Sequence, residues 1–138
     1  MSCVFCAIVA GTAPASVVYD DERVMAFMDL MPVNPGHLLV VPRRHAIGLS
    51  DLDPEDGARM FTVGQRLAAG LRSSGLRVEG VNLFLADGRA AFQTVFHAHL
   101  HVLPRFVGDR FRLVGFEHRE AARPELDATA AAVRATLS

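Results

Sequence analysis

The segment from Gln93 to Arg105, QTVFHAHLHVLPR, contains three of the six histidines of this 138-residue chain, at alternate positions. Side chains of an extended segment alternate between its two faces. We therefore predict a strand over residues 97–103 that presents His97, His99 and His101 on one face. The residues between and after them are apolar, so the opposite face is expected to pack in the core.

Three imidazoles on one face have two chemical uses. All three could bind a catalytic zinc ion with an open coordination position. Alternatively, the central imidazole is a nucleophile, and the flanking groups fix its tautomer and meet the developing charge. A zinc hydrolase would also need a nearby carboxylate as base or ligand partner. None lies between Thr94 and Arg105, so the segment favours the nucleophile.

The rest of the chain predicts an α+β fold, because one long helix lies between strands that look antiparallel. The helix covers residues 54–74, where Asp53 can cap the first turn and Gly75 can end the last. Its core stripe is expected to comprise Met60, Phe61, Gly64, Leu67, Ala68 and Leu71. Strands are expected at residues 16–20, 23–28, 37–42, 80–86 and 97–103, and short helices at 3–10 and 124–137.

The composition bounds the class of protein. With 51% hydrophobic and 21% charged residues and a net charge of −1, the chain resembles a soluble domain with no footprint for nucleic acid or an anionic membrane. The first positive charge is Arg23, so a signal peptide is not indicated, and no apolar run is long enough to span a membrane. We expect one domain over residues 1–138, located in the cytoplasm. Every basic residue is Arg, which excludes Schiff-base chemistry on lysine.

Several motifs together carry a resemblance to a known family. HAHLHVL at residues 97–103 resembles the signature of the histidine triad (HIT) superfamily of nucleotide hydrolases and transferases. Further matches occur in order and spacing, from residue 3 to about residue 105: CVFC at 3–6, AFMDL at 26–30, NPGHLLVVPRRH at 34–45 and GVN at 80–82. The chain is most similar to the small Hint-type and bacterial members of the superfamily.

The resemblance implies a fold, an activity and an assembly. The fold would be HIT-like, with an antiparallel sheet of about five strands, one long central helix and short helices near both ends. The activity would be hydrolysis of purine nucleoside phosphoramidates or related nucleotidyl conjugates. A dinucleoside polyphosphate hydrolase is the nearest alternative, and a nucleotide-binding regulatory module with weak catalysis is another. The chain would form a homodimer with a shared sheet.

The resemblance also implies roles for the residues around the triad. His99 would attack the α-phosphorus and form a transient nucleotidyl-histidine, while His101 would help to bind the phosphate oxygens. Gln93 and Thr94 would offer an amide and a hydroxyl group to the phosphate or the leaving group. His97 would belong both to the catalytic triad and to a metal site.

Upstream residues are implied to bind the nucleoside. Asp29 would accept hydrogen bonds from the ribose hydroxyls, although an aspartate at a strand end can equally cap a loop. The base pocket would be lined by Phe5, Ile8, Phe27 and Leu30. These four side chains are equally plausible as ordinary core.

The two cysteines have two interpretations. A Cys-x-x-Cys pair can be redox-active, but such a motif expects a strand before it and a helix starting at it. The resemblance instead implies a structural zinc ion bound by Cys3, Cys6, His45 and His97. Two thiolates and two imidazoles are a ligand set that tetrahedral structural zinc prefers.

Two positions depart from the family pattern. Ala86 stands where the family usually has an asparagine that contacts substrate, and Phe92 stands where it usually has a glycine. The neighbouring Asp87 could replace the asparagine only by bringing a carboxylate close to phosphate, which it would repel. His37 is interpreted as an ordinary histidine at a strand edge.

Overall fold

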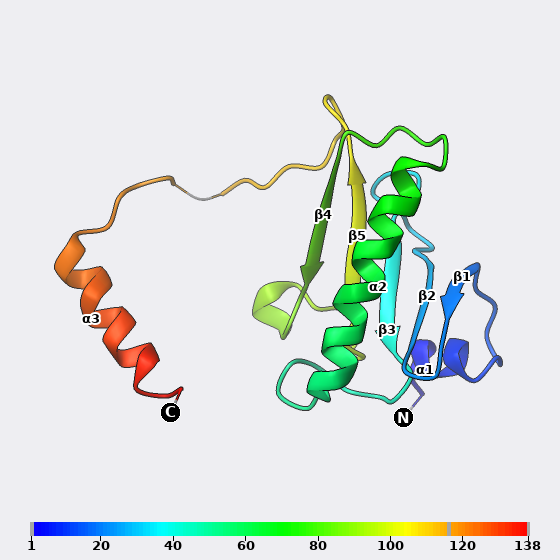
Figure 1. Cartoon of the computed structure of the whole chain (residues 1–138), viewed down its shortest axis with the longest axis horizontal. Helices are drawn as coiled ribbons and strands as arrows, with labels where there is room; N and C mark the ends of the chain where they lie inside the picture. The colour runs from blue at the N-terminus through cyan, green and yellow to red at the C-terminus, as the bar shows by residue number, and fades with distance from the viewer. Residues whose placement is uncertain (1, 116, 138) are drawn as a thin grey trace.

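The computed structural model describes residues 2–115 and 117–137 (Figure 1). Within them, one antiparallel sheet has the strand order β1-β2-β3-β5-β4. The strands are β1 (Val17–Asp20), β2 (Val24–Met28), β3 (Leu38–Pro42), β4 (Gly80–Leu85) and β5 (Leu100–Arg105); the helices are α1 (Val4–Val9), α2 (Pro54–Arg72) and α3 (Arg123–Arg134), with a 3-10 turn η1 (Arg89–Ala91). The predicted α+β fold, with five strands and one long helix, is confirmed.

Helix α2 packs across one face of the sheet (Figure 1). Its first turn is capped as predicted, because the Asp53 carboxylate accepts the backbone N–H of Glu55 at 2.9 Å. Gly64 permits a close approach between helix and sheet, since a Cβ at that position would lie 3.0 Å from Leu100. The core on this face comprises Val24, Ala26, Leu38, Val40, Met60, Val63, Leu71, Leu100 and Val102.

One prediction for the face of α2 is wrong. Phe61 was expected in the core but is 57% exposed, whereas Val63 is fully buried. Successive residues turn by about 100° around a helix, so Phe61 lies at the margin of a stripe centred on Met60. The sheet covers the side of the helix that carries Val63 and leaves the side that carries Phe61 exposed.

Helix α1 packs on the opposite face of the sheet and completes a second, smaller core (Figure 1). Phe5 is the buried residue of α1, and its ring meets that of Phe27 edge-on with centroids 5.4 Å apart. The remaining buried members of this core are Met25, Leu39 and Val41. The N-terminal segment therefore contributes to the side of the sheet that does not carry α2.

Strand β5 begins later than predicted, at Leu100 rather than at residue 97. Its pairing with β3 runs only from Leu38 to Val40. Further along β3, Pro42 has no N–H to continue a ladder, and its carbonyl oxygen accepts a hydrogen bond from the ring of His97 instead. The side chain of His97 thus bonds to β3 where backbone pairing between β3 and β5 has ended. Residues 97–99 therefore belong to the loop that leads into β5.

A buried polar node anchors the chain after β5. The carboxylate of Asp109 accepts hydrogen bonds from the Arg105 guanidinium at 2.7 and 2.8 Å and from the Asn34 amide at 2.8 Å. The same Asn34 amide also donates to the Pro104 carbonyl oxygen at 2.9 Å. These contacts bind the loop before β3 to the end of β5, and they hold the pKa of Asp109 well below its usual range, mainly through Arg105.

Beyond this node the chain leads away to α3, which lies apart from the sheet (Figure 1). The assignment of residues 1–138 to one domain therefore stays a prediction. None of the helices in the described part of the chain combines the length and apolar character needed to cross a bilayer.

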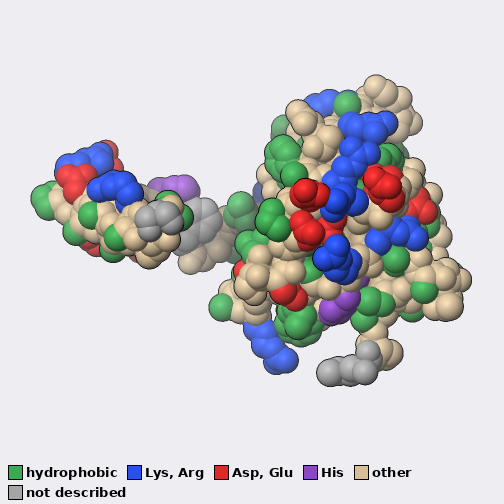
Figure 2. Space-filling view, turned by 60° about the horizontal axis from the view of Figure 1, so that its bottom comes forward, with side chains coloured by type: hydrophobic (Ala, Val, Ile, Leu, Met, Phe, Trp, Pro, Cys, Tyr) green, Lys and Arg blue, Asp and Glu red, His purple; other side chains and the backbone are tan. Residues whose placement is uncertain are grey.

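On the face seen in Figure 2, a column of basic side chains is flanked by acidic ones. Ion pairs between the β1–β2 hairpin and α2 include Arg23–Asp56 at 2.6 Å and Asp21–Arg59 at 2.7 Å. Acidic side chains beside the basic ones offset their charge on this face.

Candidate functional site

The three histidines share one side of the sheet, as predicted. The ring of Phe5 meets the rings of His97 and His99 edge-on, with centroids 5.9 and 5.2 Å apart. His101 is the direct cross-strand partner of Leu39, which belongs to the same small core. The rings nevertheless have different partners, and this divides their roles.

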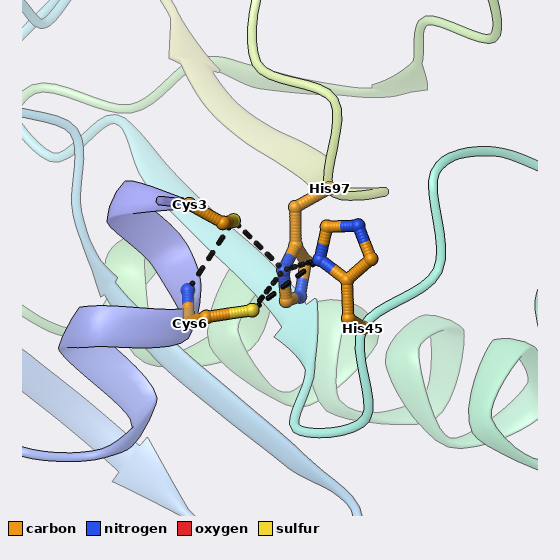
Figure 3. Close-up of side chains that lie close together, drawn as sticks. All are labelled: Cys3, Cys6, His45 and His97. Atoms are coloured by element: carbon orange, nitrogen blue, oxygen red, sulfur yellow. Dashed lines mark hydrogen bonds between the residues drawn. The ribbon is translucent and has the colours of Figure 1, made fainter. Parts of the chain in front are cut away.

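His97 faces a cluster of potential metal ligands (Figure 3). Cys3 and Cys6 come from the start of α1 and His45 from the loop after β3, and all point toward the His97 ring. The Nδ1 atom of His97 lies 3.4 Å from Sγ of Cys3, 3.6 Å from Sγ of Cys6 and 3.2 Å from Nδ1 of His45. The Sγ atom of Cys6 lies 3.3 Å from Nδ1 of His45. All four ligand atoms lie within 4.8 Å of one another.

These separations can be compared with those of a metal site. Tetrahedral zinc, with bonds of about 2.3 Å to sulfur and about 2.0–2.1 Å to nitrogen, places two nitrogen ligands about 3.3 Å apart and a nitrogen and a sulfur about 3.6 Å apart. The four distances above differ from these values by no more than about 0.3 Å. The ligand set predicted from sequence is therefore brought together, and its donor atoms fit a tetrahedral metal ion.

The tautomer of His97 supports the same conclusion. Its Nε2 atom lies 2.8 Å from the carbonyl oxygen of Pro42, which can only accept, so Nε2 carries the proton. Nδ1 is then a bare lone pair that faces the cluster. A metal-ligating histidine characteristically donates its other N–H to a carbonyl oxygen in this way.

His99 is a neutral, oriented imidazole. The residue is buried, with only 5% of its surface exposed. Its Nδ1 atom lies 2.8 Å from the carbonyl oxygen of His97, so the proton resides on Nδ1 and Nε2 is bare. Burial lowers the pKa of His99, so that the unprotonated form is favoured near neutral pH. An imidazole with a bare Nε2 is a competent nucleophile.

His101 forms a relay with His37, which lies 64 positions away in the sequence. Nε2 of His37 and Nδ1 of His101 are 2.9 Å apart, while Nδ1 of His37 accepts the backbone N–H of Val33 at 3.1 Å. Because that N–H can only donate, His37 carries its proton on Nε2 and donates it to His101. The neutral His101 then has its own N–H on Nε2, free to donate to a ligand.

The relay stays neutral at physiological pH. Burial, followed by the neighbouring His99 and His37, lowers the pKa of His101 to about 4. Burial is also the largest cause of the lowered pKa of His37. His101 is thus a neutral donor at neutral pH, rather than an imidazolium.

The interpretation of His37 as an ordinary strand-edge histidine is wrong. Its partner His101 is distant in sequence, so spacing gives no sign of the pair. Asp29, His37 and His101 also lie close enough to hold a metal ion, but the proton that Val33 fixes on Nε2 of His37 argues for a hydrogen bond there. Among the described residues, His99 belongs to no cluster of metal-binding size, which disfavours a zinc ion bound by all three triad histidines.

We predict that His37→Ala lowers kcat/KM about 10- to 100-fold for the nucleotide conjugates that the resemblance implies as substrates. Loss of a residue that orients a functional histidine has an effect of this size. The orientation of His101 would no longer be fixed, while the metal content should be unchanged. His37→Gln offers an amide with both a donor and an acceptor, so it should recover part of the loss. Steady-state kinetics and metal analysis of both variants would test this; equal activity of wild type and His37→Ala would refute it.

Asp29 shows features of both of its interpretations. Its Oδ1 atom accepts the backbone N–H of Met31 at 2.9 Å, which is the loop-capping role. Its Oδ2 atom lies 3.5 Å from Nε2 of His37, at the side of the relay. One carboxylate oxygen is therefore oriented by the loop, and the other faces the histidines, where a ribose contact stays a prediction.

The four residues expected around the base differ in burial. Phe5 and Phe27 are buried against each other, and Ile8 is partly buried beside them. Leu30 is 94% exposed, so on its own it encloses nothing. A base pocket at this position would lie between the buried Phe5–Phe27 pair and an open loop.

Gln93 has a different role from the one expected. Its side chain is buried, and Nε2 donates to the carbonyl oxygens of Ile47 at 2.6 Å and Val95 at 3.1 Å. Its Oε1 accepts the N–H of Gly88 at 2.8 Å. Both amide protons are used within the chain, so Gln93 braces the loop and has no N–H left for a phosphate. Thr94 is exposed, and its hydroxyl remains available to a ligand.

The loop after β4 carries the two departures from the family pattern. Ala86 is buried and supplies no polar group. Asp87 does not replace the missing amide, because its Oδ1 accepts the N–H of Leu49 at 3.3 Å in the loop that follows His45. It approaches so closely that a Cβ on Gly48 would lie 2.1 Å from Oδ1. Asp87 therefore joins two loops instead of facing a substrate.

Phe92 occupies a backbone conformation suited to glycine. Its φ of 69° makes it the only non-glycine residue with positive φ among those described. A left-handed conformation costs an L-residue roughly 1–2 kcal/mol. The ring gains little in return within the chain, since Phe92 is 86% exposed. The fold thus retains the turn that the usual glycine would make, under strain.

We predict that Phe92→Gly is neutral or stabilising, by up to about 1 kcal/mol, because relief of strain exceeds the entropy cost of glycine. The matched control is Ala91→Gly, at an exposed neighbour with ordinary φ, which should destabilise by roughly 0.5–1 kcal/mol. Urea unfolding midpoints of both variants give the comparison. A Phe92→Gly variant as destabilised as the control would show that the strain is not there.

Comparison with known sequences matches the chain to one family. The sequence profile of the HIT domain matches residues 10–108. An uncharacterized HIT-like protein of Mycobacterium tuberculosis strain H37Rv is 45% identical over 139 residues, covering 100% of this chain and 94% of that protein. "Protein hit" of Bacillus subtilis strain 168 is 36% identical over 125 residues, covering 90% of this chain and 86% of that protein.

Solved structures give the same picture. A Zn-bound histidine triad family protein from Mycobacterium smegmatis superposes with a TM-score of 0.78 at 46% identity, over 99% of this chain and 98% of that one. A HIT family protein from Bacillus anthracis superposes with a TM-score of 0.90 at 36% identity, over 99% and 97% of the two chains.

Proposed function

This chain belongs to the HIT family of the nucleotide-binding hydrolase and transferase superfamily, and we propose that it cleaves purine nucleoside phosphoramidates or related nucleotidyl conjugates. The catalytic group is His99, acting through a nucleotidyl-histidine intermediate. The observation that carries this proposal is the hydrogen bond from Nδ1 of His99 to the His97 carbonyl oxygen, 2.8 Å long. It leaves Nε2 bare and oriented.

The reaction follows from the protonation states of the rings. The Nε2 lone pair of His99 attacks the α-phosphorus, the bond from phosphorus to the leaving nitrogen breaks, and the leaving amine takes up a proton from solvent water, while His99 keeps its own proton on Nδ1. Charge on the phosphate oxygens is met by the N–H on Nε2 of His101, and the exposed Thr94 hydroxyl can contribute. Water then cleaves the bond between His99 and phosphorus and releases the nucleoside monophosphate. Phosphoryl transfer requires mainly positioning and charge stabilisation, which neutral imidazoles can supply.

The metal in this proposal is a structural zinc ion at Cys3, Cys6, His45 and His97. When bound, it supplies four coordinate bonds that join α1 to the loop after β3 and to the histidine stretch. Two thiolates and two imidazoles would together leave no position open for water. The cluster is therefore assigned to architecture rather than to bond cleavage.

A second candidate function has support from the loop after β4. Ala86 offers no side-chain amide and Phe92 strains the turn beside the site, which would suit a nucleotide-binding regulatory module with weak catalysis. A dinucleoside polyphosphate would be cleaved by the same nucleophile. All three candidate functions require a bound nucleotide, and they differ in turnover and in the leaving group.

A cytoplasmic location remains part of the proposal.

The proposed assembly is a homodimer that extends the sheet. β4 lies at an edge of the sheet and pairs over six residues without a bulge, whereas the other edge strand, β1, is short and irregular. A regular exposed edge is a template for pairing with another strand. The exposed Phe61 on α2 gives an apolar group to such an interface. Sedimentation equilibrium should give twice the chain mass of 14.9 kDa; a single-chain mass would rule the dimer out.

The test of the proposed function is turnover with trapping of the intermediate. Purified protein is incubated with adenosine 5′-phosphoramidate and, separately, a diadenosine polyphosphate labelled in the α-phosphate. Release of AMP, with label retained on the protein after rapid denaturation, would support the nucleotidyl-histidine route. Binding of AMP without turnover of either compound would favour the regulatory module instead.

A further inference from the structure

Two of the groups that contact the ring of His99 belong to the metal-binding cluster or adjoin it, and the third is the ring of His101, with centroids 4.9 Å apart. The carbonyl oxygen that accepts its Nδ1 proton is that of His97, a member of the cluster. The ring of Phe5 also meets it edge-on, and Phe5 stands in the sequence between Cys3 and Cys6. The nucleophile is thus contacted from two sides by segments that carry three of the four candidate ligands, Cys3, Cys6 and His97.

The peptide group between His97 and Ala98 is fixed at each of its ends. Its N–H, on Ala98, donates to the carbonyl oxygen of Ala46 at 2.7 Å, and Ala46 directly follows the ligand His45. Its carbonyl oxygen, on His97, accepts the proton of His99. The His97 ring is held in turn by Pro42 through Nε2 and by the cluster through Nδ1. Movement of any ligand segment would therefore displace the acceptor that sets the tautomer of His99.

We propose that the cluster of Cys3, Cys6, His45 and His97 is a positioning device for the nucleophile, in addition to a brace for the N-terminal segment. With a metal bound, the 97–98 peptide and the ring of Phe5 are fixed, and His99 keeps its proton on Nδ1 and its bare Nε2 toward the substrate. Without metal, the acceptor moves and His99 exchanges between its two tautomers and ring orientations. This inference rests on the proposed function of His99. A misplacement of about 1 Å costs about 100-fold in rate.

A purely architectural cluster predicts a different kinetic result. Loss of metal would then loosen α1, which carries Phe5 and Ile8 of the expected base pocket, and would raise KM. The rate at saturating substrate would be unchanged, because His99 would still be correctly oriented. The division between kcat and KM therefore separates the two roles.

The test uses the full chain and the variant His45→Ala, which removes one ligand on an exposed loop and leaves every residue of α1 intact. Chelator-treated wild type is measured beside it as a second metal-free form. Val9→Ala is the matched control, because Val9 is a partly buried residue of α1 that binds no metal. Each sample is assayed for zinc per chain, for kcat and KM on adenosine 5′-phosphoramidate, and for the ¹⁵N chemical shifts of the His99 ring at about pH 8, where an ordinary imidazole is neutral.

The expected result is a fall in kcat of about tenfold or more in both metal-free forms, with His99 signals that report a mixture of tautomers. Val9→Ala should retain its zinc and a kcat within about twofold of wild type, with the proton on Nδ1. Restored zinc should restore the kcat of chelated wild type.

Two results would overturn the inference. One is a metal-free form whose kcat equals that of loaded protein while KM rises. The other is a His99 tautomer that does not respond to metal. If loaded wild type turns over no nucleotide conjugate, the proposed function fails, and the ¹⁵N comparison alone then decides whether the cluster positions His99.

Discussion

Replacement of His99 by alanine is expected to reduce kcat at least about 10³-fold, the scale of loss seen when a covalent nucleophile is removed. The variant should bind nucleotide with nearly unchanged affinity, because the proposed phosphate donor on His101 and the proposed nucleoside contacts remain. It should also keep its metal, because His99 belongs to no metal-sized cluster among the described residues. Steady-state and single-turnover kinetics, metal analysis and nucleotide titration together give these quantities.

A matched pair of variants separates a nucleophile from a structural histidine. His99→Gly leaves a space beside Phe5, and free imidazole added to this variant can supply the missing nucleophile in solution. Partial recovery of turnover that depends on imidazole concentration is expected for His99→Gly, with none for wild type. A His99→Ala variant that still forms labelled intermediate would refute the assignment, and one that loses its metal would return attention to a zinc site built from the triad.

Loss of the proposed zinc ion is expected to have the second large effect, on stability. A ligand present at 1,000 times its dissociation constant stabilises the folded state by about 4 kcal/mol, which corresponds to a melting temperature roughly 10–20 °C higher for a chain of this size. Cys6→Ala should lose this contribution, because removal of one ligand opens the tetrahedral shell and frees α1. Calorimetry with and without added zinc measures the difference.

The control for this prediction is wild type treated with a chelator. Its melting temperature should fall to that of Cys6→Ala, and added zinc should restore wild type but not the variant. A redox-active cysteine pair predicts the opposite dependence, in which a thiol reductant shifts the melting temperature and a chelator does not. That result would assign Cys3 and Cys6 to disulfide chemistry.

The fold was largely predictable because its signals are local. The capped helix after Asp53 and the short apolar strands depend on neighbouring residues, and both were confirmed. The start of β5 was predicted three residues too early, since a proline on the neighbouring strand stops the pairing. The burial of Phe61 was wrong for a related reason, because the sheet beneath α2 decides where an apolar stripe ends.

The candidate site was predictable only in part. The four candidate metal ligands were implied by the resemblance, and their side chains meet as expected in Figure 3. The partner of His101 was missed, because His37 lies far away in the sequence and its neighbours resemble an ordinary strand edge. The role of Gln93 was misassigned for the same reason, since both acceptors of its amide are backbone carbonyls that no sequence pattern marks.

The sequence by itself determined the fold class and the shared face of the three histidines, because these depend on residue type and spacing. The four candidate metal ligands were implied by its resemblance to the family. Only the tertiary structure decided how each imidazole is protonated. A tautomer is set by the one group that can only donate or only accept, and here those groups are Pro42, the His97 carbonyl and Val33. Packing brings the carbonyl oxygen of Pro42 to the ring of His97, which is distant in the sequence. The loop before β3 brings the N–H of Val33 to the ring of His37. Together with the His97 carbonyl oxygen, these contacts place the proton on Nε2 in His97 and His101 and on Nδ1 in His99.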